Sequence, residues 1–103
     1  MAATGRITLT PSQLRTSAGR YGTSADEIDA ILGRLRREQN TIRSNWQGGA
    51  FDKFELQFNS LVPKVQDFAR LLRDIDSQLR SVANIIERTD QDIARQINVL
   101  GSN

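Results

Sequence analysis

The sequence predicts an all-α fold, an antiparallel two-helix hairpin that dimerises into an elongated four-helix bundle. Two runs of mostly apolar residues, spaced alternately three and four positions apart, indicate two long helices that each carry an apolar stripe. The segment Trp46-Gln47-Gly48-Gly49 separates the runs and predicts a turn at 46–49. The 103 residues make one small domain, and domains of this size often need a partner to bury enough apolar surface.

The first helix is expected at about residues 11–45. Thr10, Pro11 and Gln13 form an N-cap, a first-turn proline and a capping-box partner. Ile7 and Leu9 precede them in a short arm that we expect to be extended. The stripe of this helix contains one polar residue, Gln39, among Leu14, Ala18, Tyr21, Ala25, Ile28, Leu32, Leu35, Ile42 and Trp46.

Three glycines lie inside the first helix, at positions 19, 22 and 33, and each weakens it by about 1 kcal/mol relative to alanine. We interpret them as tolerated surface positions; the other interpretation is close backbone approach or a hinge. Ser24 and Glu27 could form a second capping box, which would break the helix near Gly22. Because the apolar spacing continues unchanged through this point, we expect one helix.

The second helix is expected at about residues 50–98. Pro63 removes one backbone donor, but the apolar spacing resumes at Val65, so a kink is predicted and not an end. A flanking set, Val62, Ala69, Leu71 and Ala83, widens the apolar face. The stripe itself comprises Phe51, Phe54, Phe58, Leu61, Val65, Phe68, Leu72, Ile75, Leu79, Val82 and Ile86.

The short turn makes the helices antiparallel neighbours, so their register can be counted outward from it. Leu14 then lies opposite Val82, and the second helix continues for roughly 15 residues, an overhang of around 20 Å. Apolar residues on this overhang, and a face too wide for two helices, call for a second copy or a homologous hairpin. The residues expected in the hairpin and dimer seam are Leu14, Ile28, Leu35, Phe54, Phe58, Leu61, Phe68 and Leu72.

The composition argues against an enzyme and against any cofactor. The chain has no Cys and no His, which removes the usual zinc, haem and iron–sulfur ligands and the common nucleophile pairs. Asp74 and Asp76, like Asp90 and Asp92, are two positions apart and diverge on a helix. The net charge of +2 is interspersed along the chain, so we interpret the basic residues as solvated surface and expect no nucleic-acid partner.

The turn motif Trp46-Gln47-Gly48 admits two interpretations. Trp46 is expected to close the core of the hairpin by packing on Phe51 and Phe54, while Gly48 is free to adopt the left-handed conformation that ends a helix. A partner protein could also recognise this end of the hairpin. The residues themselves support the first interpretation.

With its central Trp46-Gln47-Gly48, its entry at Thr10-Pro11 and its phenylalanine-rich second helix, the chain resembles the WXG-100 family of early-secretory-antigen-like proteins. The resemblance implies a dimeric hairpin that is exported by a type VII secretion system and recognised by a membrane-bound secretion ATPase. It also implies export without a cleaved signal peptide. Residues 1–10 contain no apolar core of the kind that such a peptide needs, in keeping with that expectation.

The resemblance also suggests an export signal. The family pattern of hydrophobic residues around an aspartate fits Ile86, Asp90, Ile93 and Ile97, which fall near one helical face wholly within the overhang. The same spacing could merely prolong the stripe, but Asp90 is poor core chemistry. The family's second signal, Tyr-x-x-x-Asp/Glu, is absent because Tyr21 has Ala25 four residues later, a departure that resembles the homodimeric members.

The expected function is therefore that of a non-enzymatic, dimeric secreted protein whose C-terminal segment is the export signal. The first alternative is a cytosolic chaperone or adaptor that escorts a larger co-secreted toxin as a heterodimer. The others are a basic helical nucleic-acid binder and a membrane-lytic protein; the latter would normally show a larger basic face. No stretch approaches the roughly 20 apolar residues that span a bilayer.

Overall fold

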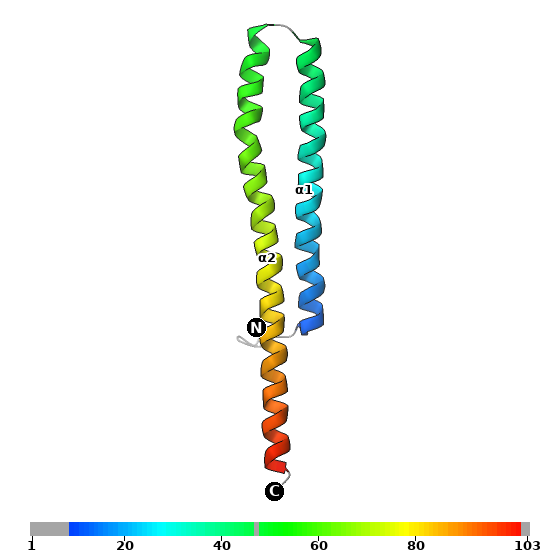
Figure 1. The fold of residues 1–103 in the computed structure, drawn as a ribbon, viewed down its shortest axis with the longest axis vertical. Coiled ribbons are helices and arrows are strands. Elements are labelled where there is room, and N and C mark those ends of the chain that lie inside the picture. Colours follow the sequence, from blue (N-terminus) through cyan, green and yellow to red (C-terminus); the bar gives the residue numbers. More distant parts are fainter. Residues whose placement is uncertain (1–8, 47, 102–103) are drawn as a thin grey trace, which may run out of the picture.

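The computed structural model describes residues 9–46 and 48–101, which form two helices in an antiparallel hairpin. Helix α1 spans Pro11–Asn45 and helix α2 spans Gly49–Gly101. They lie side by side with the turn at one end, and α2 continues past the start of α1 at the other (Figure 1). The molecule measures 85 × 29 × 16 Å. This confirms the all-α hairpin; Ile7 of the expected arm and Gln47 of the turn lie outside the described residues.

Helix α1 begins with the predicted capping box. The Thr10 hydroxyl accepts a hydrogen bond from the backbone N–H of Gln13 at 3.1 Å, and the Gln13 side chain accepts one from the backbone N–H of Thr10 at 2.8 Å. Two donors that a helix start leaves unpaired are thereby satisfied. The helix then runs through Gly22 without interruption, so the second capping box considered at Ser24 starts no new helix.

The turn is made by an extended residue and a glycine. Trp46 ends α1 with φ −113° and ψ 130°, and Gly48 has φ 127°, a conformation that side-chain-bearing residues rarely adopt. Helix α2 starts at the next residue, Gly49, and continues through Pro63 to Gly101. Since Pro63 has no N–H, it cannot make the helical hydrogen bond to the carbonyl oxygen of Asn59.

The most deeply buried residues at the contact between the helices are small. Ala18 and Ala25 on α1 and Ala69 and Ala83 on α2 are fully or almost fully buried. Small side chains let the two backbones come close, and larger neighbours are then displaced to the sides of the contact. The buried set is completed by Leu14, Leu32, Gln39, Phe51 and Val62.

This packing changes the expected division of the α2 stripe. Three residues assigned to the flanking set, Val62, Ala69 and Ala83, are buried against α1. The large residues Phe54, Leu61 and Phe68, assigned to the main seam, remain 39%, 49% and 52% exposed. The physical reason is that the buried alanines let the backbones come close along much of the contact, so Phe54, Leu61 and Phe68 are displaced to its side, whereas Leu14, Leu32 and Phe51 are still accommodated elsewhere along it.

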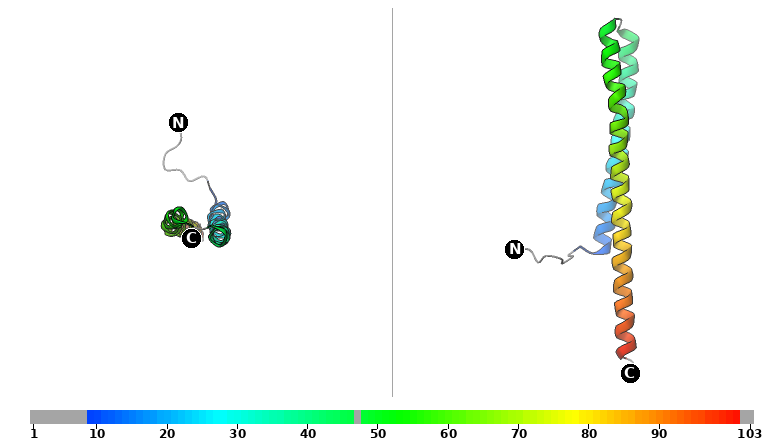
Figure 2. Two further views of the ribbon diagram at one scale, coloured as in Figure 1. Left: turned by 90° about the horizontal axis from the view of Figure 1, so that it is seen from above. Right: turned by 90° about the vertical axis from the view of Figure 1, so that its left-hand side faces the viewer.

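The two sides of the hairpin differ in chemistry. On the side that we call the charged side, ion pairs cross between the helices from Arg15 to Glu87 at 2.7 Å and from Arg43 to Glu55. Arg73 of α2 similarly reaches Asp26 and Asp29 of α1 at 2.9 and 2.6 Å. Exposed pairs each stabilise a fold only weakly, but together they favour one register. Figure 2 shows a single layer of two helices, which leaves both broad sides uncovered.

Candidate functional site

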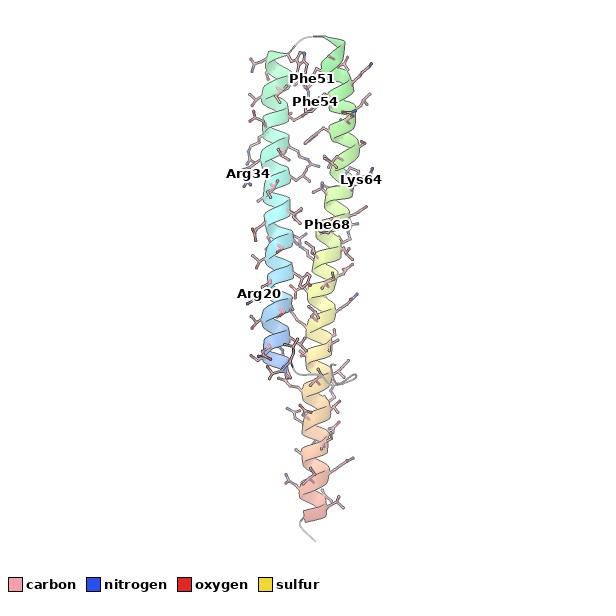
Figure 3. All side chains as sticks on the ribbon, turned by 180° about the vertical axis from the view of Figure 1, so that it is seen from behind. Arg20, Arg34, Phe51, Phe54, Lys64 and Phe68 are labelled. Carbon is pink, nitrogen blue, oxygen red and sulfur yellow. The ribbon has the colours of Figure 1, made fainter. Side chains whose placement is uncertain are left out.

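The side opposite the ion pairs, which we call the apolar side, carries a row of large hydrophobic residues. Its groove is lined by Tyr21 and Ile28 of α1 and by Phe68 and Leu72 of α2, with a volume of about 340 Å³. In Figure 3, Phe54 and Phe68 lie along the helix contact, whereas Arg20 and Arg34 project from the outer edge of α1 and Lys64 from that of α2. The apolar side is thus a hydrophobic strip with cationic side chains beside it.

The structure distributes the eight predicted seam residues unequally. Leu14 is buried, and Ile28, Phe58 and Leu72 are half-buried. The remaining four are more than a third exposed: Leu35, Phe54, Leu61 and Phe68. Within one hairpin, therefore, half of the predicted seam is left partly uncovered.

The turn end of the hairpin holds an aromatic cluster. The ring of Trp46 lies 5.6 Å from that of Phe51 and 6.4 Å from that of Phe54, measured between centroids, and the last two rings are 6.2 Å apart. Such pairs contribute roughly 0.5–1.5 kcal/mol each beyond their burial. The predicted contact of Trp46 with both phenylalanines is present, yet 44% of Trp46 stays exposed.

The C-terminal arm, residues 91–101, is the part of α2 that has no helix beside it. All of its residues are exposed, including Ile93 at 50% and Ile97 at 62%. At 1.5 Å per residue it is about 16 Å long. Its side chains form one local ion pair, Arg95 with Asp92 at 2.6 Å.

The first half of the predicted export signal lies elsewhere. Ile86 and Asp90 line a recess together with Leu9, Thr10 and Pro11 at the start of α1. The expectation that all four signal residues occupy the overhang is therefore wrong. Counting the register from the turn placed the start of α1 opposite Val82. In the structure, α1 starts several residues further along α2, beside Ile86 and Asp90.

A hydrogen-bonded ion pair fastens the start of α1 to α2. Arg15 donates two hydrogen bonds to the Glu87 carboxylate, at 2.7 and 2.8 Å, and a third to the side-chain oxygen of Asn84 at 2.7 Å. These bonds lower the pKa of Glu87 and raise the pKa of Arg15 from their ordinary values. The hydrogen bonds of Arg73 to Asp26 and Asp29 likewise raise its pKa.

Two residues of α1, Gly22 and Gln39, were noted in the sequence without a functional role. A Cβ atom at Gly22 would overlap the carboxylate of Asp76, which is the movable end of a side chain, so an alanine here requires that carboxylate to shift. Gln39 is only 5% exposed, and its Nε2 has no hydrogen-bond partner. The sequence does place Gly22 on the charged side. Together with Arg15, Asp29, Arg36 and Arg43 it forms a row of residues spaced seven positions apart.

The described residues offer no site for metal chemistry. Within 9–46 and 48–101, no three His, Cys, Asp or Glu side chains gather in a way that could hold a metal ion. Across the same two ranges, neither helix contains a stretch apolar enough to cross a membrane.

Known proteins match this sequence over nearly its whole length. The chain is 50% identical to an ESAT-6-like protein of Streptococcus agalactiae over 93 residues, 90% of this chain and 97% of that protein. It is 40% identical to the type VII secretion system extracellular protein A of Staphylococcus aureus, again over 93 residues, 90% of this chain and 96% of that protein.

Solved structures superpose on this hairpin over most of its length. EsxA of Geobacillus thermodenitrificans superposes with a TM-score of 0.79 at 34% identity, covering 86% of this chain and 99% of that one. The secreted protein EsxB of Bacillus anthracis gives 0.76 at 26% identity, covering 85% and 99%. The model of the family "Proteins of 100 residues with WXG" matches residues 6–91, which include α1, the turn motif and α2 as far as Gln91. The chain belongs to the WXG100 family.

Proposed function

We propose that this protein is a non-enzymatic substrate of a type VII secretion system, exported as a dimer of hairpins with its C-terminal segment as the export signal. The relatives named for type VII secretion support the pathway. The observation that carries the proposal is the pair of uncovered apolar surfaces, the apolar side and the C-terminal arm. Surfaces of this kind on a small helical protein mark sites of protein association.

The apolar side is suited to a second copy or a homologous hairpin. Fully burying the exposed half of a large apolar side chain gains on the order of 1 kcal/mol. With five such residues on each of two copies the gain is on the order of 10 kcal/mol, comparable to the cost of association. The five are Leu35, Phe54, Leu61, Phe68 and Val82, with exposed fractions of 47%, 39%, 49%, 52% and 43%.

Light scattering on the purified chain tests the dimer. The wild type should have twice the chain mass of 11.5 kDa, and Phe68→Glu should shift it toward the monomer because it buries a charge. Leu56→Glu is the matched control, since Leu56 is 70% exposed and off the apolar side. A wild-type monomer would exclude the homodimer. A complex formed only with a homologous hairpin or a larger secreted protein would favour the adaptor role.

The C-terminal arm is suited to recognition by a membrane-bound secretion ATPase. Ile93 and Ile97 are four positions apart, so they project from one helical face as exposed apolar anchors. Asp90 is exposed beside the start of α1, where it can meet a donor or a cation on the partner. Ile86, half-buried next to it, would join the two surfaces.

Export from the native host tests the signal. Asp90→Ala and Ile93→Ala should reduce the exported fraction while leaving the dimer mass unchanged. Gln96→Ala, an exposed arm residue outside the pattern, should be exported normally. If both signal variants are exported as the wild type is, the assignment of the export signal is wrong. The dimer is tested independently by the mass from light scattering.

A further inference from the structure

A recess on the charged side of the hairpin contains hydrogen-bonding groups that the fold does not use. We call it the Gln39 recess; its volume is about 450 Å³. Its walls come from both helices, in the part of the hairpin nearer the turn. The lining residues are Arg36, Gln39, Asn40 and Arg43 of α1 and Phe58, Asn59 and Val62 of α2.

The first unused group is a buried donor. Gln39 is 5% exposed and its Nε2 has no partner, although burying such a group without a hydrogen bond is costly. The terminal torsion of glutamine is broad and roughly two-fold, so rotation about it can present the amide N–H to the recess. An acceptor placed there would satisfy it.

The second unused group is a cation. Arg36 lies three positions before Gln39, on the neighbouring part of the same helical surface, and no ion pair links it to the described part of the chain. Arg43, four positions after Gln39, is already engaged: it donates to Glu55 and, at 3.0 Å, to the side-chain oxygen of Asn40. The free positive charge of the recess is therefore that of Arg36.

The third unused group is an acceptor on the opposite wall. Pro63 cannot donate to the carbonyl oxygen of Asn59, so this oxygen lacks its helical hydrogen bond. Phe58 and Val62 supply apolar surface next to it. The recess thus combines a donor and a cation on α1 with an acceptor and an apolar wall on α2.

We propose that the Gln39 recess binds an acidic side chain, together with its own backbone N–H, from a peptide segment of a partner protein. The carboxylate accepts hydrogen bonds from Arg36 and Gln39. The methylene groups of the acidic side chain pack on Phe58 and Val62, and the backbone N–H of the same residue donates to the Asn59 carbonyl oxygen. A free carboxylate leaves that carbonyl unsatisfied, which is why a peptide fits better. The recess faces away from the apolar side, so a dimer formed there leaves it open.

Nuclear magnetic resonance on the full chain tests this assignment with defined probes. The blocked tripeptide Ala-Glu-Ala should shift the Gln39 side-chain NH2 and Arg36 Nε–H signals saturably, with half-saturation in the millimolar range expected of a ligand this small. The neutral Ala-Gln-Ala should bind at least about tenfold more weakly, since a charge-assisted hydrogen bond is lost. Propionate should also bind more weakly than Ala-Glu-Ala.

Matched variants separate the three groups. Arg36→Gln should weaken Ala-Glu-Ala binding about tenfold. Arg37→Gln should not change it, because Arg37 does not line the recess. Pro63→Ala restores a helical donor to the Asn59 carbonyl, so it should weaken the tripeptide and leave propionate unchanged.

Four outcomes would overturn the proposal: no saturable shift, equal binding of Ala-Gln-Ala, propionate as strong as the tripeptide, or equal effects of the two arginine variants. The measurement does not require export or dimerisation. Its failure is therefore distinguishable from failure of the proposed function.

Discussion

Replacing the buried Gln39 by leucine should make the protein more stable. The side chain is 5% exposed and its Nε2 is unsatisfied, and an unsatisfied buried donor costs about 1–3 kcal/mol. Leucine of similar size removes that cost and buries more apolar surface beside Phe58 and Val62. We expect the free energy of unfolding to rise by about 1–3 kcal/mol, and the melting temperature by at least about 5 °C.

Urea unfolding followed by circular dichroism measures this change, with all variants at one chain concentration because association adds to apparent stability. Gln57→Leu is the control: Gln57 is exposed, so its replacement should change stability by no more than about 0.5 kcal/mol. If Gln39→Leu is no more stable than the wild type, the reasoning is refuted, because Gln39 must then have a partner. If it is more stable and no longer binds Ala-Glu-Ala, the glutamine is retained for binding at the expense of stability.

Two further predictions concern the charged side. Gly33→Ala should stabilise the protein by about 1 kcal/mol, since a Cβ there is 3.8 Å from its nearest neighbour. Gly22→Ala should raise the stability less, or lower it, because it displaces the Asp76 carboxylate. Paired thermal melts compare the two variants. The pKa of Glu87 is lowered by its bonds to Arg15, so its contribution to stability is present above the ordinary glutamate pKa and is lost as pH falls through the lowered value. The difference in unfolding free energy between wild type and Glu87→Gln should accordingly be largest near neutral pH and shrink in acid; a difference that stays constant down to the lowest pH at which the chain folds would contradict this.

The spacing of residues around the buried alanines of α1 explains why the hairpin has two chemically different broad sides. Residues three and four positions after a buried alanine lie on opposite sides of it, so Ala18 is followed by Tyr21 on one side and Gly22 on the other. The repeat of this unit every seven residues separates large hydrophobic residues from charged ones along α1. Ion pairs close one side within the hairpin, while the hydrophobic side is left for another chain.

The sequence by itself determined the helices and the turn. Apolar spacing, the capping box at Thr10 and the glycine at position 48 act over a few residues, so their structural consequences can be read locally. The same spacing identified the wide hydrophobic face and the apolar residues of the arm. Because these signals are local, the hairpin and the contact of Trp46 with Phe51 and Phe54 were predictable.

Only the tertiary structure decided which apolar residues face the other helix and which residues of α2 lie beside the start of α1. Two adjacent rows of α2 are both apolar, and the buried alanines on both helices bring the backbones close enough to select the row with Val62, Ala69 and Ala83. The same packing places Ile86 and Asp90 beside the start of α1 and buries Gln39 without a partner. These outcomes depend on distances between segments far apart in the chain, which no local spacing contains.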